Sequence, residues 1–303
     1  MQHRYHQFES GRGLQYIKSQ LHVSWLFCLF RDNALLSLPL ISLILLFGAL
    51  AGFLAGLLGI GGGVILVPLF LWLFPLAQVP PDIVVHTAFG TSLAIIIPTA
   101  ISSTYGHRKH GNVAWRQVMF LALGGTFGAL LGATLAAFLS GQVLKSCFGA
   151  MQMIIGLKLL FFHPRLPPEY EQVPGGLALT SVGFAGGCFS SFFGVGGGVV
   201  AVPLMLIFLR LPIRLAVGNS SALIVVSSLA GALSYVWHGL QAGVVADWTL
   251  GYVNLLVAMV VAPMTILFAR LGVRIANRVS QDKLLNVFAV LLILIGVKMI
   301  LRI

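Results

Sequence analysis

Long apolar stretches are the feature that most restricts how this chain can fold. Ten of them follow one another along 303 residues, and eight approach the 20 or so residues that a helix needs to cross a bilayer core about 30 Å thick. Only 8% of the residues are charged, against about 25% in soluble domains. The sequence therefore predicts an all-α polytopic membrane protein. The stretches are residues 35–58, 64–77, 86–104, 118–139, 145–162, 175–193, 197–209, 215–236, 249–268 and 284–301.

Two of these stretches, 64–77 and 197–209, are too short to cross a bilayer alone. Each comes with a run of three glycines at its start, Gly61 to Gly63 in the first case and Gly196 to Gly198 in the second. Each glycine run is therefore predicted to break a membrane helix into one long segment and one short segment.

The two glycine runs belong to an internal duplication. Residues 59–69 read GIGGGVILVPL, and residues 194–204 read GVGGGVVAVPL. AFGTS at 88–92 matches AVGNS at 216–220, and the matches keep the same order. The predicted organisation is a polar N-terminal tail over 1–34, a first transmembrane repeat over 35–162, a cytoplasmic linker over 163–174 and a second transmembrane repeat over 175–303.

Positive charge predicts which loops face the cytoplasm, because Lys and Arg are retained on that side. Outside the tails, four segments carry ten Lys and Arg residues, whereas the other loops carry one, Lys145. These four segments share one side only if each glycine-broken pair of helices enters the membrane and returns to the same side. Each repeat then has five elements, so the second repeat is inverted relative to the first. The segments predicted to be cytoplasmic are 105–117, 163–174, 210–214 and 269–283.

Each glycine run is predicted to start a short helix at depth in the membrane. The first N–H groups of a helix have no partner within it, and they present partial positive charge. Glycine also permits positive φ and close approach to the backbone. Two such helix starts would form an anion site near the bilayer midplane; alternatively, the glycines serve only close helix packing. The candidate substrate-binding residues here are Gly59, Gly61, Gly62, Gly63, Gly194, Gly196, Gly197 and Gly198, and Pro68 and Pro203 are predicted to kink the short helices.

Polar residues at matching positions of the two repeats are the second set of candidates. Thr91 and Ser92 correspond to Asn219 and Ser220, and Ser221 follows directly. Hydroxyl and amide groups donate hydrogen bonds to an oxyanion without adding charge. Alternatively, these side chains bond to the backbone of their own helix, as Ser and Thr commonly do.

Several functions lack the residues that they require. None of the seven acidic residues lies in a predicted span, although intramembrane carboxylates are typical of proton and sodium pumps. No Walker-type phosphate loop, zinc-protease motif or hydrolase nucleophile elbow is present. We therefore expect neither an enzyme nor a cofactor. No metal site is expected, because His107 and His110 have no third ligand nearby. The basic residues indicate topology, so nucleic acid is not an expected partner.

At residues 56–70 and 191–205 the chain resembles the sulfite exporter TauE/SafE family of membrane permeases. AFGTS at 88–92 and GNVAW at 111–115 add to the resemblance, which covers most of residues 36–301. This family is described as moving sulfite, sulfonates and related organosulfur anions, often outward. The resemblance therefore implies a multi-pass anion transporter, with the bacterial inner membrane as the expected location.

One segment departs from the repeat. The second repeat has VAP at 261–263, where the first has the glycine-rich GGTFG at 124–128. This difference puts close packing of the second-repeat helix in doubt and favours a kink at its proline instead.

The sequence leads to one main hypothesis and two alternatives. The main hypothesis is a secondary transporter, an exporter of sulfite or an organosulfonate, in which one repeat rocks against the other. A passive anion channel would use the same helix starts in an open path. A membrane assembly subunit would have no flux of its own. The expected partners are a small anion and the lipid bilayer, and homo-oligomerisation is left open.

Overall fold

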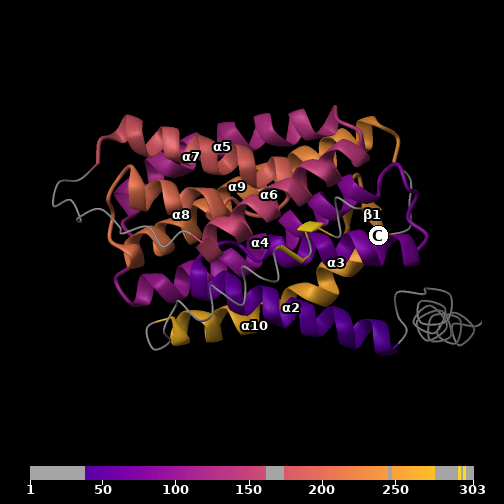
Figure 1. Cartoon of the computed structure of the whole chain (residues 1–303), viewed down its shortest axis with the longest axis horizontal. Coiled ribbons are helices and arrows are strands. Elements are labelled where there is room, and N and C mark those ends of the chain that lie inside the picture. Colours follow the sequence, from indigo (N-terminus) through magenta and orange to yellow (C-terminus); the bar gives the residue numbers. More distant parts are fainter. Residues whose placement is uncertain (1–37, 162–173, 245–247, 277–292, 295, 298–303) are drawn as a thin grey trace, which may run out of the picture. The chain divides into compact units, whose positions relative to one another are not determined.

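The structure is a computed structural model that describes residues 38–161, 174–244, 248–276, 293–294 and 296–297. Residues 38–43 group with the preceding segment as a separate unit, and the description below concerns residues from Ile44 onward. The described chain is almost entirely helical (Figure 1). Its elements are α2 (Leu38–Leu58), α3 (Gly63–Leu76), α4 (Val84–Lys109), α5 (Trp115–Ala137), α6 (Gly141–Phe161), α7 (Gly176–Phe193), α8 (Gly198–Ile207), α9 (Ile213–Gln241), β1 (Thr249–Leu250), β2 (Val253–Asn254) and α10 (Leu255–Ile275).

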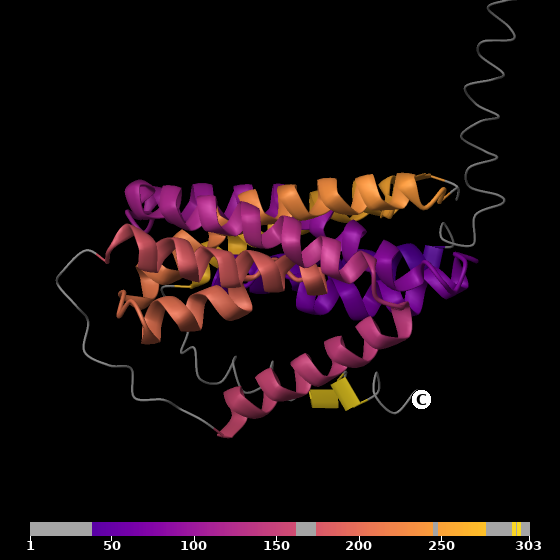
Figure 2. The same cartoon turned by 90° about the horizontal axis from the view of Figure 1, so that it is seen from above.

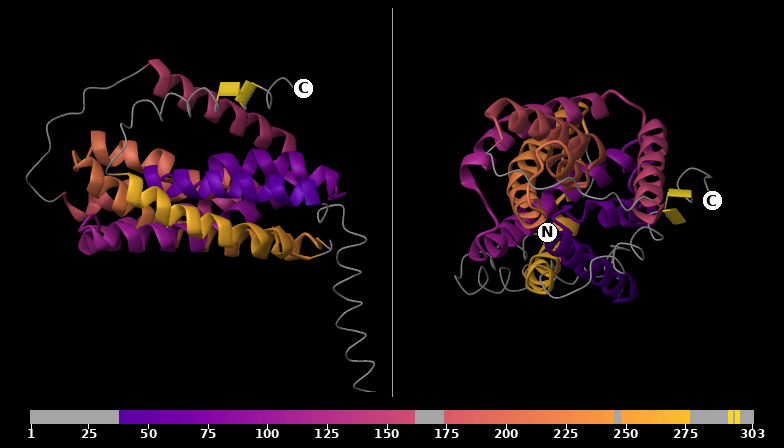
Figure 3. Two further views of the ribbon diagram at one scale, coloured as in Figure 1. Left: turned by 90° about the horizontal axis from the view of Figure 1, so that it is seen from below. Right: turned by 60° about the vertical axis from the view of Figure 1, so that its left-hand side comes forward.

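Six of the described helices, α2, α4, α5, α7, α9 and α10, are long and apolar enough to cross a membrane. The prediction of an all-α polytopic membrane protein is therefore confirmed. The stretch predicted at 145–162 is the helix α6, which runs obliquely to the others (Figures 2 and 3). Apart from four residues, the stretch predicted at 284–301 lies outside the described residues.

The chain breaks twice at the predicted glycine runs. Between α2 and α3 the backbone takes φ values of +64°, +88° and +77° at Gly59, Gly61 and Gly62. Between α7 and α8 the corresponding values are +68°, +89° and +71°, at Gly194, Gly196 and Gly197. These left-handed conformations are readily available to glycine alone. The sequence repeat is thus also a repeat of backbone geometry.

At each break the chain turns back on itself. Gly62 packs on the carbonyl of Ala51, and Gly197 packs on the carbonyl of Gly186. Both contacts reach back eleven positions along the preceding helix. In Figure 1, α3 and α8 lie toward opposite ends of the molecule. How these ends are oriented in a membrane stays a prediction.

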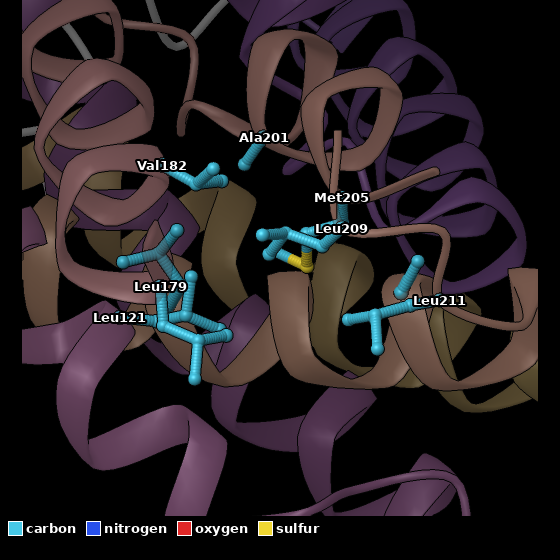
Figure 4. Packing of buried hydrophobic residues seen from close by; sticks show 9 residues of the cluster. Leu121, Leu179, Val182, Ala201, Met205, Leu209 and Leu211 are labelled. Carbon is cyan, nitrogen blue, oxygen red and sulfur yellow. The ribbon is translucent and has the colours of Figure 1, made fainter. Parts of the chain in front are cut away.

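Helix α8 returns along α7, and apolar residues fix this arrangement. Leu179 and Val182, from the beginning of α7, share a buried cluster with Met205, near the end of α8, and with Leu209 and Leu211 just beyond it (Figure 4). Contact between the first turns of one helix and the last turn of the next requires the two to run antiparallel. The cluster is completed by Leu121 of α5, Ala201 of α8, and Ala216 and Leu223 of α9.

Glycines join α7 closely to α5, a helix of the other repeat. Gly124, Gly128 and Gly132 of α5 face the backbone carbonyls of Thr180, Phe184 and Cys188, respectively. Four-residue spacing places these glycines on one helix face, which lets two backbones approach. These three glycines therefore serve close helix packing.

The equivalent contact joins α2 to α10. Gly52 and Gly56 of α2 face the backbone of Thr265 and Ala269 on α10, and Gly272 of α10 faces the carbonyl of Phe53. The expectation that close packing is lost around residues 261–263 is wrong. The reason is that Gly52 and Gly56 of α2 and Gly272 of α10 supply the small residues of this contact, so glycine is not required at 261–263. Each broken helix pair thus packs against a helix of the other repeat.

Candidate functional site

The two chain breaks lie against each other. We call residues 59–62 the first break and residues 194–197 the second break. A Cβ atom added to Gly61 would lie 3.2 Å from the Cα of Gly196 and 2.9 Å from the carbonyl oxygen of Val195. Gly198, at the start of α8, faces the carbonyl of Gly59. The predicted meeting of the two glycine runs is therefore present, in direct backbone contact.

Each break also packs against the long helix that follows the other break. Gly59 faces the backbone and side chain of Val217 on α9, and Gly194 faces the backbone of Phe89 on α4. Phe89 and Val217 occupy matching positions of AFGTS and AVGNS. The first break thus contacts a helix of the second repeat, and the second break makes the matching contact with a helix of the first repeat. The side chains nearest to a Cβ atom added at Gly196 are those of Ile96 of α4, at 3.2 Å, and Ile224 of α9, at 3.3 Å.

The starts of α3 and α8 are buried and have no side-chain cap. The amide of Ile65 donates the first helical hydrogen bond of α3 to Gly62, at 3.1 Å, and that of Val200 donates the first in α8 to Gly197, at 3.1 Å. The amides before these have no intrahelical partner, which favours a water molecule or an anion beside them. Within the described residues, the amides that form no backbone hydrogen bond at these starts are those of Gly62, Gly63, Val64, Gly197 and Val199.

Thr91 and Asn219 each hold the start of a helix in the other repeat. The backbone amide of Asn254 donates to Thr91 Oγ1 at 2.9 Å, and that of Ala114 donates to Asn219 Oδ1 at 2.9 Å. Asn219 also donates from Nδ2 to Gln117 Oε1 at 2.7 Å. Both side chains are fully buried. In this conformation the two predicted substrate-binding side chains anchor α10 and α5, and their equivalent bonds extend the symmetry of the repeat.

The serines that follow them differ from each other. Ser220 Oγ donates to the carbonyl of Gly59 at 3.0 Å, across the two repeats. Ser221 donates to Val217, within its own helix, at 3.0 Å, as the alternative interpretation expected. Ser92 is fully buried, and its hydroxyl has no hydrogen-bond partner among the described residues. Of the four predicted polar residues, Ser92 is therefore the one whose oxygen is unused.

The predicted prolines lie inside the short helices. Pro68 is within α3 and Pro203 within α8, and the helix continues past each of them. Proline at position 68 cannot donate to the carbonyl of Val64. Gln152 Nε2 of α6 donates to that carbonyl instead, at 3.0 Å. A residue outside the glycine pattern therefore stabilises the first turn of α3.

The sequence model of one protein family, described as "Sulfite exporter TauE/SafE", matches residues 44–299. The chain belongs to this family. It is 30% identical to a "Probable membrane transporter protein" of Haemophilus influenzae, over 86% of this chain and 98% of the relative. It is 32% identical to a protein of that description from Xylella fastidiosa, over 84% and 93% of the two chains. The "Probable membrane transporter protein YunE" of Bacillus subtilis is 27% identical, over 85% and 96%. No solved structure matches.

Membership of the TauE/SafE family, the names of the relatives and the six spans together establish a multi-pass integral membrane protein of a transporter family. Such a protein moves a small molecule across a lipid bilayer. Where the TauE/SafE chain is described, no group of three or more His, Cys, Asp or Glu residues is arranged to hold a metal ion.

One further residue of this TauE/SafE protein lies at the breaks and was not among the sequence candidates. Ser190, in the last turn of α7, is fully buried, and its hydroxyl has no partner among the described residues. A Cβ atom added to Gly197 would lie 2.9 Å from Ser190 Cβ. Ser190 therefore stands beside the start of α8. The sequence offered one signal for this role, because Ser190 lies one helical turn before Gly194. The matching residue of the first repeat is Ala55, so no polar residue recurs at this position.

Proposed function

We propose that this TauE/SafE protein is a secondary transporter that exports a small anion of the sulfite or organosulfonate class. The anion binds near the membrane midplane between the starts of α3 and α8. The observation that carries the proposal is the meeting of two buried, uncapped helix starts at Gly62 and Gly197. Unpaired amides at such a depth are costly unless a polar ligand or water satisfies them, and the dipole of a helix start favours negative charge.

Neutral donors support an anion as the substrate. Ser92 and Ser190 are both fully buried, and neither hydroxyl is bonded within the described part of the chain. Ser92 is one helical turn from Phe89, which contacts the second break. These hydroxyls are neutral donors. They can donate hydrogen bonds to an oxyanion without placing a positively charged side chain in the membrane interior. We infer that Ser92 and Ser190 complete the site formed by the glycine amides, with Thr91, Asn219 and Ser220 supporting its walls.

Transport requires the two breaks to separate, because they touch in this conformation. We propose that one set of helices rocks against the other around the breaks, as in transporters built from inverted repeats. The basic loops, which we assign to the cytoplasmic side, would concentrate anions at that mouth. A higher anion concentration at the cytoplasmic mouth favours transport out of the cell.

The test uses purified protein in proteoliposomes. We expect saturable uptake of radiolabelled sulfite, counterflow when unlabelled sulfite is inside, and competition by methanesulfonate but not by chloride. Saturation with counterflow identifies a carrier. Large single-channel currents in planar bilayers would identify a passive channel and contradict the proposal. Absence of flux, together with absence of thermal stabilisation by any sulfur anion, would indicate an assembly subunit, because a ligand that binds the native state raises its apparent stability.

A further inference from the structure

Two side chains hold the broken helices from equivalent positions in the two repeats. Nε2 of His107, near the end of α4, lies 3.1 Å from the carbonyl oxygen of Gly56 on α2. The hydroxyl of Tyr235 on α9 donates to the carbonyl oxygen of Ser191 on α7 at 3.0 Å. The repeat that relates AFGTS to AVGNS relates His107 to Tyr235, and the repeat of the glycine runs relates Gly56 to Ser191. The same contact is thus made by histidine in one repeat and by tyrosine in the other.

The carbonyl partner determines which imidazole nitrogen carries the hydrogen. A carbonyl oxygen only accepts, so Nε2 of His107 is the N–H nitrogen, and Nδ1 of the neutral ring has the free lone pair. His107 is 4% exposed, and Nδ1 has no hydrogen-bond partner among the residues described. Histidine can take up a proton near neutral pH, whereas tyrosine in the equivalent position keeps its proton. Only one of the two contacts can therefore titrate.

The groups around His107 make its protonation depend on a nearby anion. On its own helix it is followed by Arg108, Lys109 and His110, and the packed helix α10 carries Arg270 and Arg274. Residues 44–58 of α2 and all of α3 carry no titratable side chain. A proton on Nδ1 thus joins a positive neighbourhood. Two negative features oppose this: the carbonyl end of α2, and the anion that the proposed function would bind at the first break, three residues beyond Gly56. The remaining titratable residues of α9 besides Tyr235 are Arg214 and His238.

We propose that Nδ1 of His107 is the binding site of a proton that crosses the membrane with the anion. The proton adds to the Nδ1 lone pair to give imidazolium, while Nε2–H stays bonded to Gly56. It leaves to water on the other side after the anion has gone. One proton accompanies each transport cycle, because Tyr235 supplies no second site. This inference rests on the proposed function and assigns its coupling ion.

Two substitutions separate proton binding from the helix contact. His107→Tyr introduces the residue that makes this contact in the second repeat, and His107→Gln retains an N–H donor without a titrating nitrogen. His110→Tyr is the matched control, since His110 is an exposed histidine on the same helix end whose Nδ1 lies 2.9 Å from the carbonyl oxygen of Gly106.

The decisive experiment measures sulfite flux and internal pH together, with a trapped pH-sensitive dye in proteoliposomes. In the wild type and in His110→Tyr, sulfite flux should move protons. In His107→Tyr or His107→Gln, the number of protons moved per sulfite transported should fall at least about tenfold, to background. Proton movement at the wild-type ratio to sulfite in either His107 variant would overturn the proposal. The proposal would also be overturned if the wild-type protein transported sulfite without moving protons.

A second measurement does not depend on flux. Nitrogen-15 NMR of histidine-labelled protein follows the protonation of His107 directly, with and without sulfite. We expect Nδ1 to take up a proton as the pH falls, and at a higher pH when sulfite is bound. If no variant binds or transports any sulfur anion, the proposed function fails and this titration still shows whether the site takes a proton. A His107 ring that stays neutral down to the pH of unfolding overturns the proton site itself.

Discussion

Gly61 and Gly196 belong to different repeats, yet a Cβ atom added to either one would lie 3.2 Å from the Cα of the other. Both residues have positive φ, +88° and +89°. A side chain is therefore unfavourable at each position for two reasons. The residue has a positive φ, and the opposite break lies where the side chain would be. The glycines allow the two breaks to pack closely, and they also leave the starts of α3 and α8 without a capping side chain.

Replacement of Gly61 by alanine should destabilise the protein more than a change in backbone preference explains. A left-handed alanine costs about 1–2 kcal/mol, and contact with the second break adds about 1–3 kcal/mol of overpacking. Gly111 is the matched control, because it has φ +72° and a Cβ there would meet nothing within 4 Å. Thermal unfolding in detergent should show a larger fall in Tm for Gly61→Ala than for Gly111→Ala. Equal losses would mean that the two breaks do not touch.

The seam between α5 and α7 gives a prediction about helix packing. Gly128→Ala would place a methyl group against the carbonyl of Phe184 and 2.9 Å from the amide of Cys188. The helices would have to move apart, at a cost of about 1–3 kcal/mol. Gly175→Ala, where a Cβ meets nothing within 4 Å and φ is −62°, should lower stability less, by the small preference for glycine over alanine at the N-cap of α7. A Gly128→Ala variant as stable as Gly175→Ala would contradict the close seam.

Asn219 should contribute more to stability than Thr91, although the two are equivalent in the repeat. Asn219→Ala leaves the amide of Ala114 and the side chain of Gln117 without their partner, whereas Thr91→Val frees only the amide of Asn254. Each unsatisfied buried group costs about 1–3 kcal/mol. Thr126→Val is a control, since its hydroxyl bonds within its own helix. The Tm should be highest in Thr126→Val, lower in Thr91→Val and lowest in Asn219→Ala. Reversal of the last two would argue against the Gln117 bond.

Ser92 and Ser220 should separate binding from stability. Ser220→Ala removes a hydrogen bond to Gly59 and should cost about 1 kcal/mol of stability. Ser92→Ala breaks no hydrogen bond within the described chain, so its Tm without ligand should equal that of wild type. The rise in Tm caused by sulfite should shrink in Ser92→Ala. A full sulfite response in that variant would remove Ser92 from the proposed site.

The sequence predicted the helical segments and both breaks, because apolar length and clustered glycine act locally. It could not show that the repeats exchange partners, since the contact between Gly194 and Phe89 depends on tertiary packing alone. The error at residues 261–263 has the same origin. The close contact is made by Gly52 and Gly56 of α2 and by Gly272 of α10, which lie away from the segment at 261–263. The roles of Thr91 and Asn219 were also hidden, because the oxygen of each accepts from a backbone amide, a group that every residue except proline carries.

The exchange of partners determines when each contact can form during synthesis. The partner of Gly128 on α7 follows it by about 55 residues, whereas Ala269, the partner of Gly56, follows by about 210 residues. At about 5–20 residues per second, the chain needs roughly 10–40 s to supply that second partner. During this interval the glycine face of α2 remains uncovered by α10. Assembly therefore proceeds from the middle of the chain outward, and the first described helix waits for the last long one.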